Sequence, residues 1–347
     1  MASKLILHIG SPKTGTSALQ RWLYENRNQI LASGIYLPVS VGTPNNRCLS
    51  AAFDPSRRFD VAIVDHFMTR HSIAQSDCKA FRERVLYEFE AEMARSSPDL
   101  VVVTSEHFHQ LVNTQDSIDD LASYLTGLFD SVLILCSFRE QYSMCRSRFF
   151  TALKMGKTLR FEQMLDECGP DLPLYNHLKC ARMWSTAFGS DCFKAVAYSP
   201  REGSNSITDF LDASGLSAQL THVTRNSDRV NRSLGLFGLS VLRQFNMLAE
   251  SGQVLSSSDK KTLHDFLLQS PLSQLGELHH AESAMRIFTE FSESNAQFGR
   301  EFLSLTGSPF QFDEESQQER RTWSIDEIAK AIVESLQTFK ELKSPLR

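Results

Sequence analysis

Short apolar runs alternate with longer amphipathic stretches over the first two thirds of the chain. The run Leu100–Thr104 is rich in β-branched residues and Ser131–Phe138 is largely aliphatic, so both are typical of strands buried on both faces. Strands are predicted at residues 5–9, 35–37, 100–104, 131–138 and 192–198. Because helical patterns separate these strands, we expect a parallel sheet with helices on both of its faces.

The predicted helices carry apolar residues at three- and four-residue steps, as Phe81, Val85 and Phe89 do. From about residue 233 the strand pattern ends, whereas helical patterns continue. We therefore expect an α/β domain at residues 4–232 and a helical C-terminal region at residues 233–347 that packs on it. Helices are predicted near residues 16–33, 61–72, 77–95, 116–128, 141–155, 161–167, 175–187, 207–213, 233–250, 257–269, 281–304 and 324–342.

Composition narrows the class of protein. The chain has 347 residues and a formal net charge of −5, which argues against a general role in binding nucleic acid. Its seven cysteines form no C-x-x-C pair, as expected for reduced thiols in an intracellular protein. No signal peptide and no apolar stretch of membrane-spanning length is visible, so a cytoplasmic protein without a transmembrane segment is predicted.

The predicted first strand leads into the loop Gly10–Ser17, which holds two glycines, one lysine and several hydroxyl groups before a helix begins. Backbone N–H groups and the positive end of the helix dipole make such a loop an anion site. The two glycines are spaced as in the P-loop of nucleotide triphosphatases, but Thr16 stands where their lysine would, and the lysine of this loop is Lys13. Together with the alternating strands and helices and the helical patterns after residue 233, this loop predicts a doubly wound parallel sheet of the P-loop NTPase-like type with a helical C-terminal extension. The alternative is an ordinary strand-to-helix turn with a surface lysine.

Polar residues also follow two other predicted strands. Glu106 comes just after residues 100–104, and Arg139 comes just after residues 131–138. Ligands of open α/β sheets bind beyond the carboxyl ends of the strands, so these residues are candidates for the same site as the loop. Ser147 follows Arg139 on the next predicted helix, where two helical turns would bring both side chains to one anion.

These motifs resemble those of sulfotransferases that use 3′-phosphoadenosine 5′-phosphosulfate, and the bacterial members most closely. The loop Gly10–Ser17 is similar to the 5′-phosphosulfate loop of that family, and Arg139 with Ser147 is similar to its 3′-phosphate site. The segment Asp209–Leu216 resembles the helix that closes the family's fold. The resemblance covers about residues 4–235.

The resemblance implies a sulfotransferase that moves a sulfuryl group from this nucleotide donor to an acceptor hydroxyl, on a carbohydrate or a small molecule. It implies that Lys13 stabilises the leaving oxygen during in-line transfer and that no metal is required. The donor-binding residues that it implies are Ser11, Pro12, Lys13, Thr14, Gly15, Thr16, Ser17, Arg139 and Ser147.

Glu106 is the favoured general base, because it lies at a strand end that would face the donor. The alternatives are His107 and His109, which follow directly. Later in the chain, a basic run either covers the 3′-phosphate or is a solvated linker; its arginines are Arg225, Arg229 and Arg232. The polar loop at residues 41–60 is either functional or a variable surface excursion. Candidates for lining the acceptor pocket are Asn45, Asn46, Arg47 and His66.

Two other functions remain open. A P-loop kinase or nucleotide hydrolase is disfavoured by Thr16 and by the lack of a strand-end acid for magnesium, since Asp99 precedes its strand. A non-catalytic nucleotide-binding module is disfavoured because all four candidate residues are present: Lys13, Glu106, Arg139 and Ser147.

Overall fold

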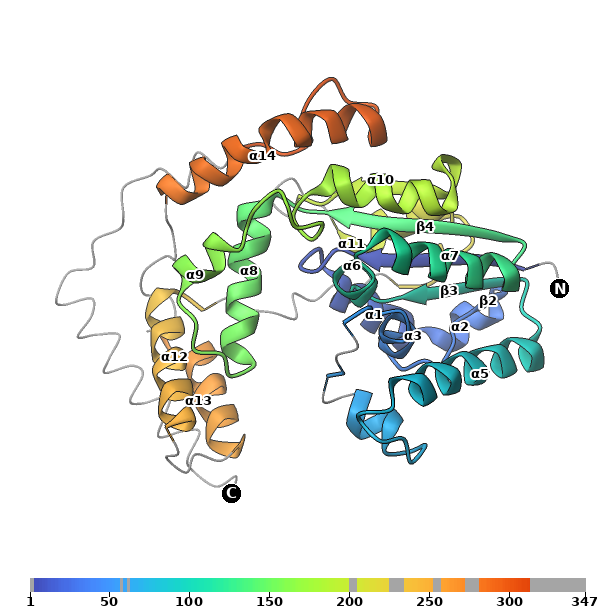
Figure 1. The fold of residues 1–347 in the computed structure, drawn as a ribbon, viewed down its shortest axis with the longest axis horizontal. Coiled ribbons are helices and arrows are strands. Elements are labelled where there is room, and N and C mark those ends of the chain that lie inside the picture. The colour runs from blue at the N-terminus through green and yellow to red at the C-terminus, as the bar shows by residue number, and fades with distance from the viewer. Residues whose placement is uncertain are drawn as a thin grey trace. The chain divides into compact units, whose positions relative to one another are not determined.

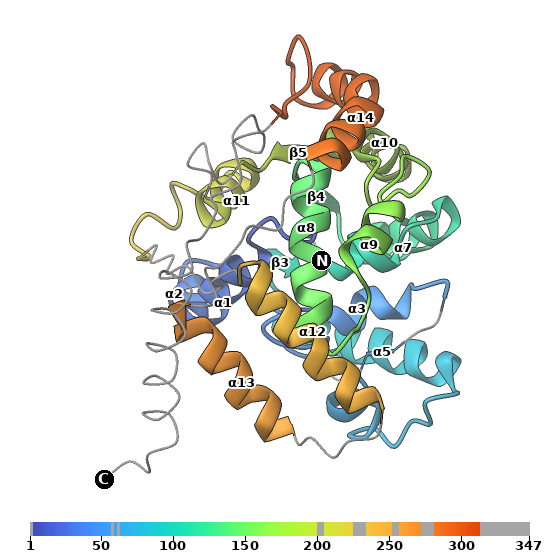
Figure 2. The same ribbon diagram turned by 90° about the vertical axis from the view of Figure 1, so that its left-hand side faces the viewer.

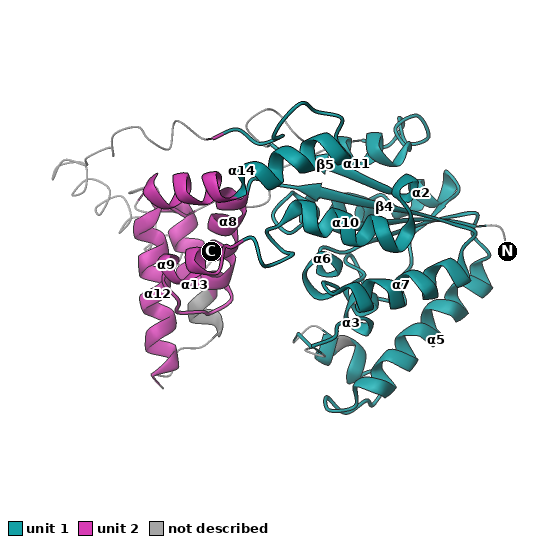
Figure 3. Ribbon diagram, turned by 45° about the horizontal axis from the view of Figure 1, so that its top comes forward, with its two compact units in different colours: residues 1–140, 170–228, 291–311 teal, residues 141–169, 229–290, 312–347 magenta. Residues whose placement is uncertain are grey.

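A computed structural model describes residues 3–56, 59–60, 63–199, 205–224, 234–251, 257–271 and 281–312. The chain forms two compact units that interleave along the sequence, shown in two colours in Figure 3. Unit 1 comprises residues 1–140, 170–228 and 291–311, and unit 2 comprises the rest. This division differs from the single predicted boundary at residue 232, because residues 141–169 group with unit 2 and residues 291–311 with unit 1.

A parallel five-stranded sheet forms the centre of unit 1, in the order β2-β3-β1-β4-β5 (Figure 1). The central strand β1 pairs with β3 from Lys4 opposite Leu100 to His8 opposite Thr104. Every predicted strand is present, so the α/β class and the parallel sheet are confirmed. The strands are β1 Lys4–Gly10, β2 Ile35–Tyr36, β3 Leu100–Thr104, β4 Ser131–Phe138 and β5 Phe193–Ala197.

Helices cover both faces of this sheet, and side chains alternate between the two faces along each strand. Ile6 and Val102 contribute to a core beneath α1, α2 and α11, whereas Leu7 and Val103 contribute to a core beneath α3, α5, α6, α7 and α10. Figure 2 shows α1, α2 and α11 on one side of the strands and α3, α5, α7 and α10 on the other. The helices of unit 1 are α1 Thr16–Glu25, α2 Arg27–Ala32, α3 Arg47–Ala52, α5 Cys78–Ser96, α6 His107–Leu111, α7 Gln115–Leu128, α10 His177–Phe188 and α11 Ser206–Ser214.

The order of the strands creates a topological switch point at the carboxyl ends of β1 and β3. The chain leaves β1 toward α1 on one face, and it leaves the adjacent β3 toward α6 and α7 on the other face. Ligands of open α/β sheets bind at such a switch point. The fold therefore places the loop after β1 and the residues after β3 at the position where a ligand is expected.

Unit 2 is helical. Asn246 joins two of its segments, because its Nδ2 donates to the carbonyl oxygens of Leu153, at 2.8 Å, and Lys157, at 2.9 Å. The helices are α8 Gln141–Lys154, α9 Phe161–Asp166, α12 Leu236–Glu250 and α13 Ser257–Gln269. The helix α14 Ala281–Phe302 is divided between the units, and its Phe298 belongs to the core of unit 1.

The helix predictions differ from the structure at a few places. The predicted first helix is interrupted at Asn26, which gives α1 and α2. The short helices α3 and α6 were not expected, and residues 64–68 form one turn of π-helix. The predicted helix at 324–342 lies outside the described residues. None of the described helices combines the length and the apolar character that crossing a membrane requires.

Candidate functional site

The loop after β1 approaches β3 very closely. A Cβ atom at Gly10 would lie 2.9 Å from the Cα atom of Glu106, and Gly10 has a φ of +98°, so only glycine fits there. Lys13 adopts a left-handed φ of 70°, which is unfavourable for a residue with a side chain and often marks functional loops. Gly15, with a φ of +80°, precedes the first turn of α1. The loop thus brings Lys13 and the start of α1 to the strand end that carries Glu106.

Several backbone N–H groups of this loop are available to a ligand. Those of Thr14, Gly15, Thr16 and Ser17 meet no hydrogen-bond acceptor among the described residues. The N–H of Ser11 instead donates to the carbonyl oxygen of Ser137 at the end of β4, at 2.6 Å. Consecutive unpaired N–H groups at a helix N-terminus are suited to hold phosphate oxygens.

Two amide side chains hold the carboxylate of Glu106. Gln20 on α1 donates to Oε2 at 2.7 Å, and Asn45, from the loop before α3, donates to the same oxygen at 3.0 Å. Asn45 in turn accepts a hydrogen bond of 2.6 Å from the hydroxyl of Ser105. Glu106 is partly exposed, whereas Gln20 and Asn45 are buried. The result is a fixed carboxylate with an accessible part.

Sequence analysis did not identify Gln20 as a site residue. The available signal was a polar residue among the buried apolar positions of α1, next to Leu19 and close to Leu23. Among the candidates for an acceptor pocket, Asn46 is 5% exposed, and its side chain bonds the backbone of Pro38, Gly42 and Thr104, so it fixes the loop that carries it. The side chain of His66 lies outside the described part of the chain.

Three histidines lie near Glu106 in sequence or in space, and burial disfavours the charged form in two of them. Burial lowers the pKa of His8 to about 4, although the negative charge of Glu106 opposes this, and its Nδ1 lies 2.9 Å from the Thr104 hydroxyl. Burial likewise lowers the pKa of His107. His109 is 2% exposed, and its ring centroid lies 6.1 Å from that of Phe138 in the core.

Arg139 follows β4 and is joined to the loop. Its NH1 donates to the carbonyl oxygen of Lys13 at 2.9 Å. The carbonyl oxygen of Arg139 lies 2.8 Å from Nε2 of His177 on α10; because a carbonyl only accepts, this nitrogen carries the proton. Burial lowers the pKa of His177 to about 3, which keeps the ring neutral. Both the side chain and the backbone of Arg139 are therefore held in place.

The predicted partner of Arg139 lies in the other unit. Ser147 is part of α8, which belongs to unit 2, whereas Arg139 belongs to unit 1. Their pairing at one phosphate therefore stays a prediction. The arginines Arg225, Arg229 and Arg232 lie outside the described residues.

The start of α11 closes another side of the loop. The hydroxyl of Ser206 donates to the carbonyl oxygen of Gly15 at 3.0 Å, and a Cβ atom at Gly15 would lie 2.7 Å from that hydroxyl oxygen. The same Cβ atom would lie 3.5 Å from the hydroxyl oxygen of Tyr198, just after β5. Polar groups that follow β3, β4 and β5 therefore surround the loop after β1.

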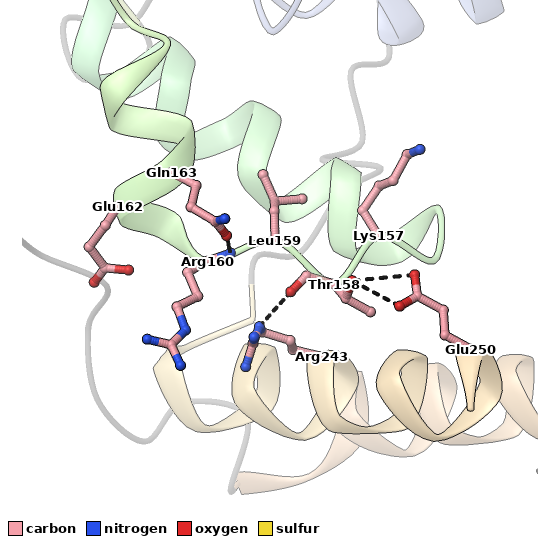
Figure 4. Close-up of a pocket in the computed structure, with 8 residues that line it drawn as sticks. All are labelled: Lys157, Thr158, Leu159, Arg160, Glu162, Gln163, Arg243 and Glu250. Carbon is pink, nitrogen blue, oxygen red and sulfur yellow. Dashed lines mark hydrogen bonds between the residues drawn. The ribbon is translucent and has the colours of Figure 1, made fainter.

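Unit 2 has a separate cleft of about 770 Å³ between the α8–α9 connection and α12 (Figure 4). Arg243 crosses it and donates to the carbonyl oxygen of Thr158 at 2.7 Å. Its lining residues are Lys157, Thr158, Leu159, Arg160, Glu162, Gln163, Arg243 and Glu250. None of the predicted site residues lines this cleft. Among the described residues, no three His, Cys, Asp or Glu side chains are grouped in a way that could hold a metal ion.

Comparisons with known proteins place few limits on the function. No protein-family model matches the chain, and no curated protein matches it. Among solved structures, the crystal structure of a sulfotransferase from Alicyclobacillus acidocaldarius is similar, with a TM-score of 0.37 and 15% sequence identity. The match covers 75% of this chain and 100% of that chain.

Proposed function

We propose that the protein is a sulfotransferase that moves a sulfuryl group from 3′-phosphoadenosine 5′-phosphosulfate to an acceptor hydroxyl. The acceptor oxygen forms a bond to sulfur while the bond from sulfur to the bridging oxygen of the donor breaks. The acceptor proton passes to Glu106, and 3′-phosphoadenosine 5′-phosphate leaves. The acceptor is a carbohydrate or a small hydroxylated molecule.

One observation carries this proposal: a partly exposed carboxylate, held by two amides, lies directly against a strand-to-helix loop with unpaired N–H groups. The loop offers donors for an anion, and the carboxylate offers an acceptor for a proton. A transfer reaction from an anionic donor to a hydroxyl group needs both at one place.

On the donor side, we assign the 5′-phosphate to the loop. The N–H groups of residues 14–17 suit its oxygens, and the hydroxyls of Thr16 and Ser17 add further donors. Lys13 then stabilises the charge that develops on the bridging oxygen. The bond from Arg139 to the Lys13 carbonyl supports this assignment, because it links the phosphate loop to the strand end proposed to bind the 3′-phosphate with Ser147.

On the acceptor side, we assign the base to Glu106 and not to a histidine. His109 is buried in the core beside Phe138, where an acceptor has no access. His107 is partly exposed, but burial lowers its pKa below that of an exposed histidine, whereas two amides hold Glu106 against the loop. Both amide donors use Oε2 of Glu106, and Oε1 accepts no hydrogen bond from the residues that the structure describes. We therefore assign proton transfer to Oε1.

The rival function is a P-loop kinase or nucleotide hydrolase, and one observation favours it. P-loop enzymes hold magnesium with an acid at a strand end, and Glu106 follows β3, the neighbour of β1. A strand-end acid is therefore present, contrary to the expectation drawn from the position of Asp99. What still separates the two functions is the lysine, since Thr16 stands where a P-loop enzyme has its lysine.

Thermal unfolding with added nucleotides tests the proposal. We expect 3′-phosphoadenosine 5′-phosphate to raise the Tm without magnesium, because two phosphate sites bind it in the folded state only. ATP should raise the Tm much less. Stabilisation by ATP that requires magnesium, and none by 3′-phosphoadenosine 5′-phosphate, would support the kinase instead.

A further inference from the structure

We propose that Gln20 and Asn45 are positioning residues that hold Glu106 in the orientation required for proton transfer. This inference rests on the proposed sulfuryl transfer, in which Glu106 acts as the base. Neither amide is expected to touch the reacting atoms.

The two amides reach one oxygen from separate parts of unit 1. Gln20 is on α1, 86 residues from Glu106, and Asn45 is in the loop before α3, 61 residues from it. Since a carboxylate oxygen accepts hydrogen bonds, the nitrogen of each amide must face it. A further hydrogen bond fixes the orientation of the Asn45 amide, because its oxygen accepts a hydrogen bond from the Ser105 hydroxyl.

The segment that carries Asn45 is itself anchored at both ends. At its start, the carboxylate of Glu92 accepts hydrogen bonds from the backbone N–H groups of Val39, at 3.0 and 3.2 Å, and Ser40, at 2.9 Å. At its end, the side-chain oxygen of Asn46 accepts a hydrogen bond from the backbone N–H of Thr104, at 2.9 Å. The backbone N–H of Asn46 donates to the carbonyl oxygen of Thr104, at 3.1 Å. These bonds tie the segment to α5 and to the last residue of β3, so Asn45 has little freedom to move away from Glu106.

The consequence for Glu106 is geometric. Two N–H donors on Oε2 fix the side-chain torsions, so Oε1 keeps one direction. A base must lie within hydrogen-bond reach of the proton that it removes, and a misplacement of about 1 Å can lower a rate about a hundredfold.

The alternative is that Glu106 only supplies a hydrogen-bond acceptor for two buried amides. Gln20 is 4% exposed and Asn45 is 6% exposed, and buried amides need partners in any protein. The two explanations differ in one respect. If the amides position Glu106, their substitution lowers turnover only while Glu106 is present. If their role is structural, their substitution lowers turnover equally when Glu106 is replaced.

A double-mutant cycle on turnover separates the explanations. Gln20→Met keeps the side-chain length and removes the donor, so we expect kcat to fall about tenfold and KM for the nucleotide donor to change less than about twofold. In the Glu106→Gln background, the same substitution should change kcat less than about twofold. Ser105→Ala is the matched control, because it removes a bond of Asn45 without removing a bond of Glu106. We expect it to lower kcat less than Gln20→Met does.

An equal loss of kcat from Gln20→Met in both backgrounds would overturn the positioning role. The same double-mutant cycle, measured by urea unfolding, distinguishes this result from a failure of the proposed function. If the wild-type protein transfers no sulfuryl group, both the proposed reaction and the positioning role are wrong. Coupling of Gln20 and Glu106 in the free energy of unfolding would then still show that the two side chains are in contact. Coupling in both cycles supports the proposal.

Discussion

Two glutamates of unit 1 lie in neighbouring parts of the sequence and are bonded in contrasting ways. Glu92 on α5 is 3% exposed, and both of its carboxylate oxygens accept hydrogen bonds, from the Tyr36 hydroxyl and from the N–H groups of Val39 and Ser40. Glu106 is partly exposed, and both hydrogen bonds that it accepts from the described residues end on Oε2. Both oxygens of the first carboxylate therefore accept bonds, whereas one oxygen of the second accepts none within the described part of the chain.

The difference separates a structural acid from a candidate catalytic one. A buried carboxylate is stable only when hydrogen bonds replace its water, and Glu92 meets that condition with backbone N–H groups of the loop it anchors. Glu106 accepts bonds from the described residues on one oxygen only, and it lies beside a loop in which the N–H groups of residues 14–17 meet no acceptor among those residues. Substitution of Glu92 should therefore lower stability, and substitution of Glu106 should lower activity.

Glu106→Gln should have the largest effect. It removes the proton acceptor and keeps the shape, so we expect sulfuryl transfer to fall about a thousandfold, within the range for loss of a general base. The change in the free energy of unfolding should be smaller than for Glu92→Gln. Steady-state kinetics and urea unfolding of the same preparation measure both. Full activity would remove Glu106 from the mechanism and direct attention to His107.

Lys13→Ala tests the loop that faces Glu106. The cation is proposed to act on the leaving oxygen, so we expect kcat to fall about a hundredfold, with a smaller loss of affinity for 3′-phosphoadenosine 5′-phosphate. Lys13→Arg keeps the charge and serves as the control. A variant with weaker nucleotide binding and unchanged kcat would show that Lys13 binds the donor without taking part in transfer.

Glu92→Gln tests the structural role assigned to the buried glutamate. The amide cannot accept all the bonds that the carboxylate accepts, so we expect the free energy of unfolding to fall by about 2 kcal/mol. Glu83→Gln on the same helix is the matched control; its side chain is 66% exposed and faces Lys79 at 3.7 Å, so the expected change is below about 0.5 kcal/mol. Equal effects of the two substitutions would contradict the structural role of Glu92.

The pH dependence of stability tests the buried histidine beside β3. The pKa of His8 is about 4 in the folded protein and near 6.5 when exposed, so the unfolded state binds more protons between these values. The free energy of unfolding should therefore fall as the pH drops from about 6.5 to 4, by up to about 1.4 kcal/mol per pH unit for this group. Above pH 6.5 the contribution of His8 is constant. His8→Asn should reduce the slope of the free energy of unfolding against pH, and an unchanged slope would contradict the burial of an uncharged ring. His177 contributes a similar pH dependence to both the wild-type protein and this variant.

The sequence predicted the parts of the fold that depend on local patterns. The aliphatic runs gave the buried strands, and the rule that ligands bind beyond strand ends pointed to Glu106 and Arg139 before any contact was known. The bond from Arg139 to Lys13 agrees with that expectation, although the residues are 126 positions apart. Predictions of this kind succeed because the carboxyl ends of parallel strands lie at one edge of the sheet.

Contacts between distant side chains could not be predicted in the same way. Nothing local to Gln20 indicates that its amide meets Glu106, because that contact depends on how α1 packs against β3. The short helix α6 was missed because His107 follows a strand within a few residues, where periodicity has no room to develop. The bonds of the Asn46 side chain to backbone were not predicted, because sequence does not distinguish a polar side chain that bonds backbone from one that faces solvent.

The central claim is that Glu106 and the loop after β1 form a site for sulfuryl transfer. The most direct measurement incubates the purified protein with 3′-phosphoadenosine 5′-phosphosulfate labelled in its sulfate group, in the presence of a chelator, with a panel of hydroxylated acceptors that includes carbohydrates. We predict that label passes to at least one acceptor with the wild-type protein and about a thousandfold more slowly with Glu106→Gln. No transfer to any acceptor, together with magnesium-dependent cleavage of ATP that also requires Glu106, would contradict the claim.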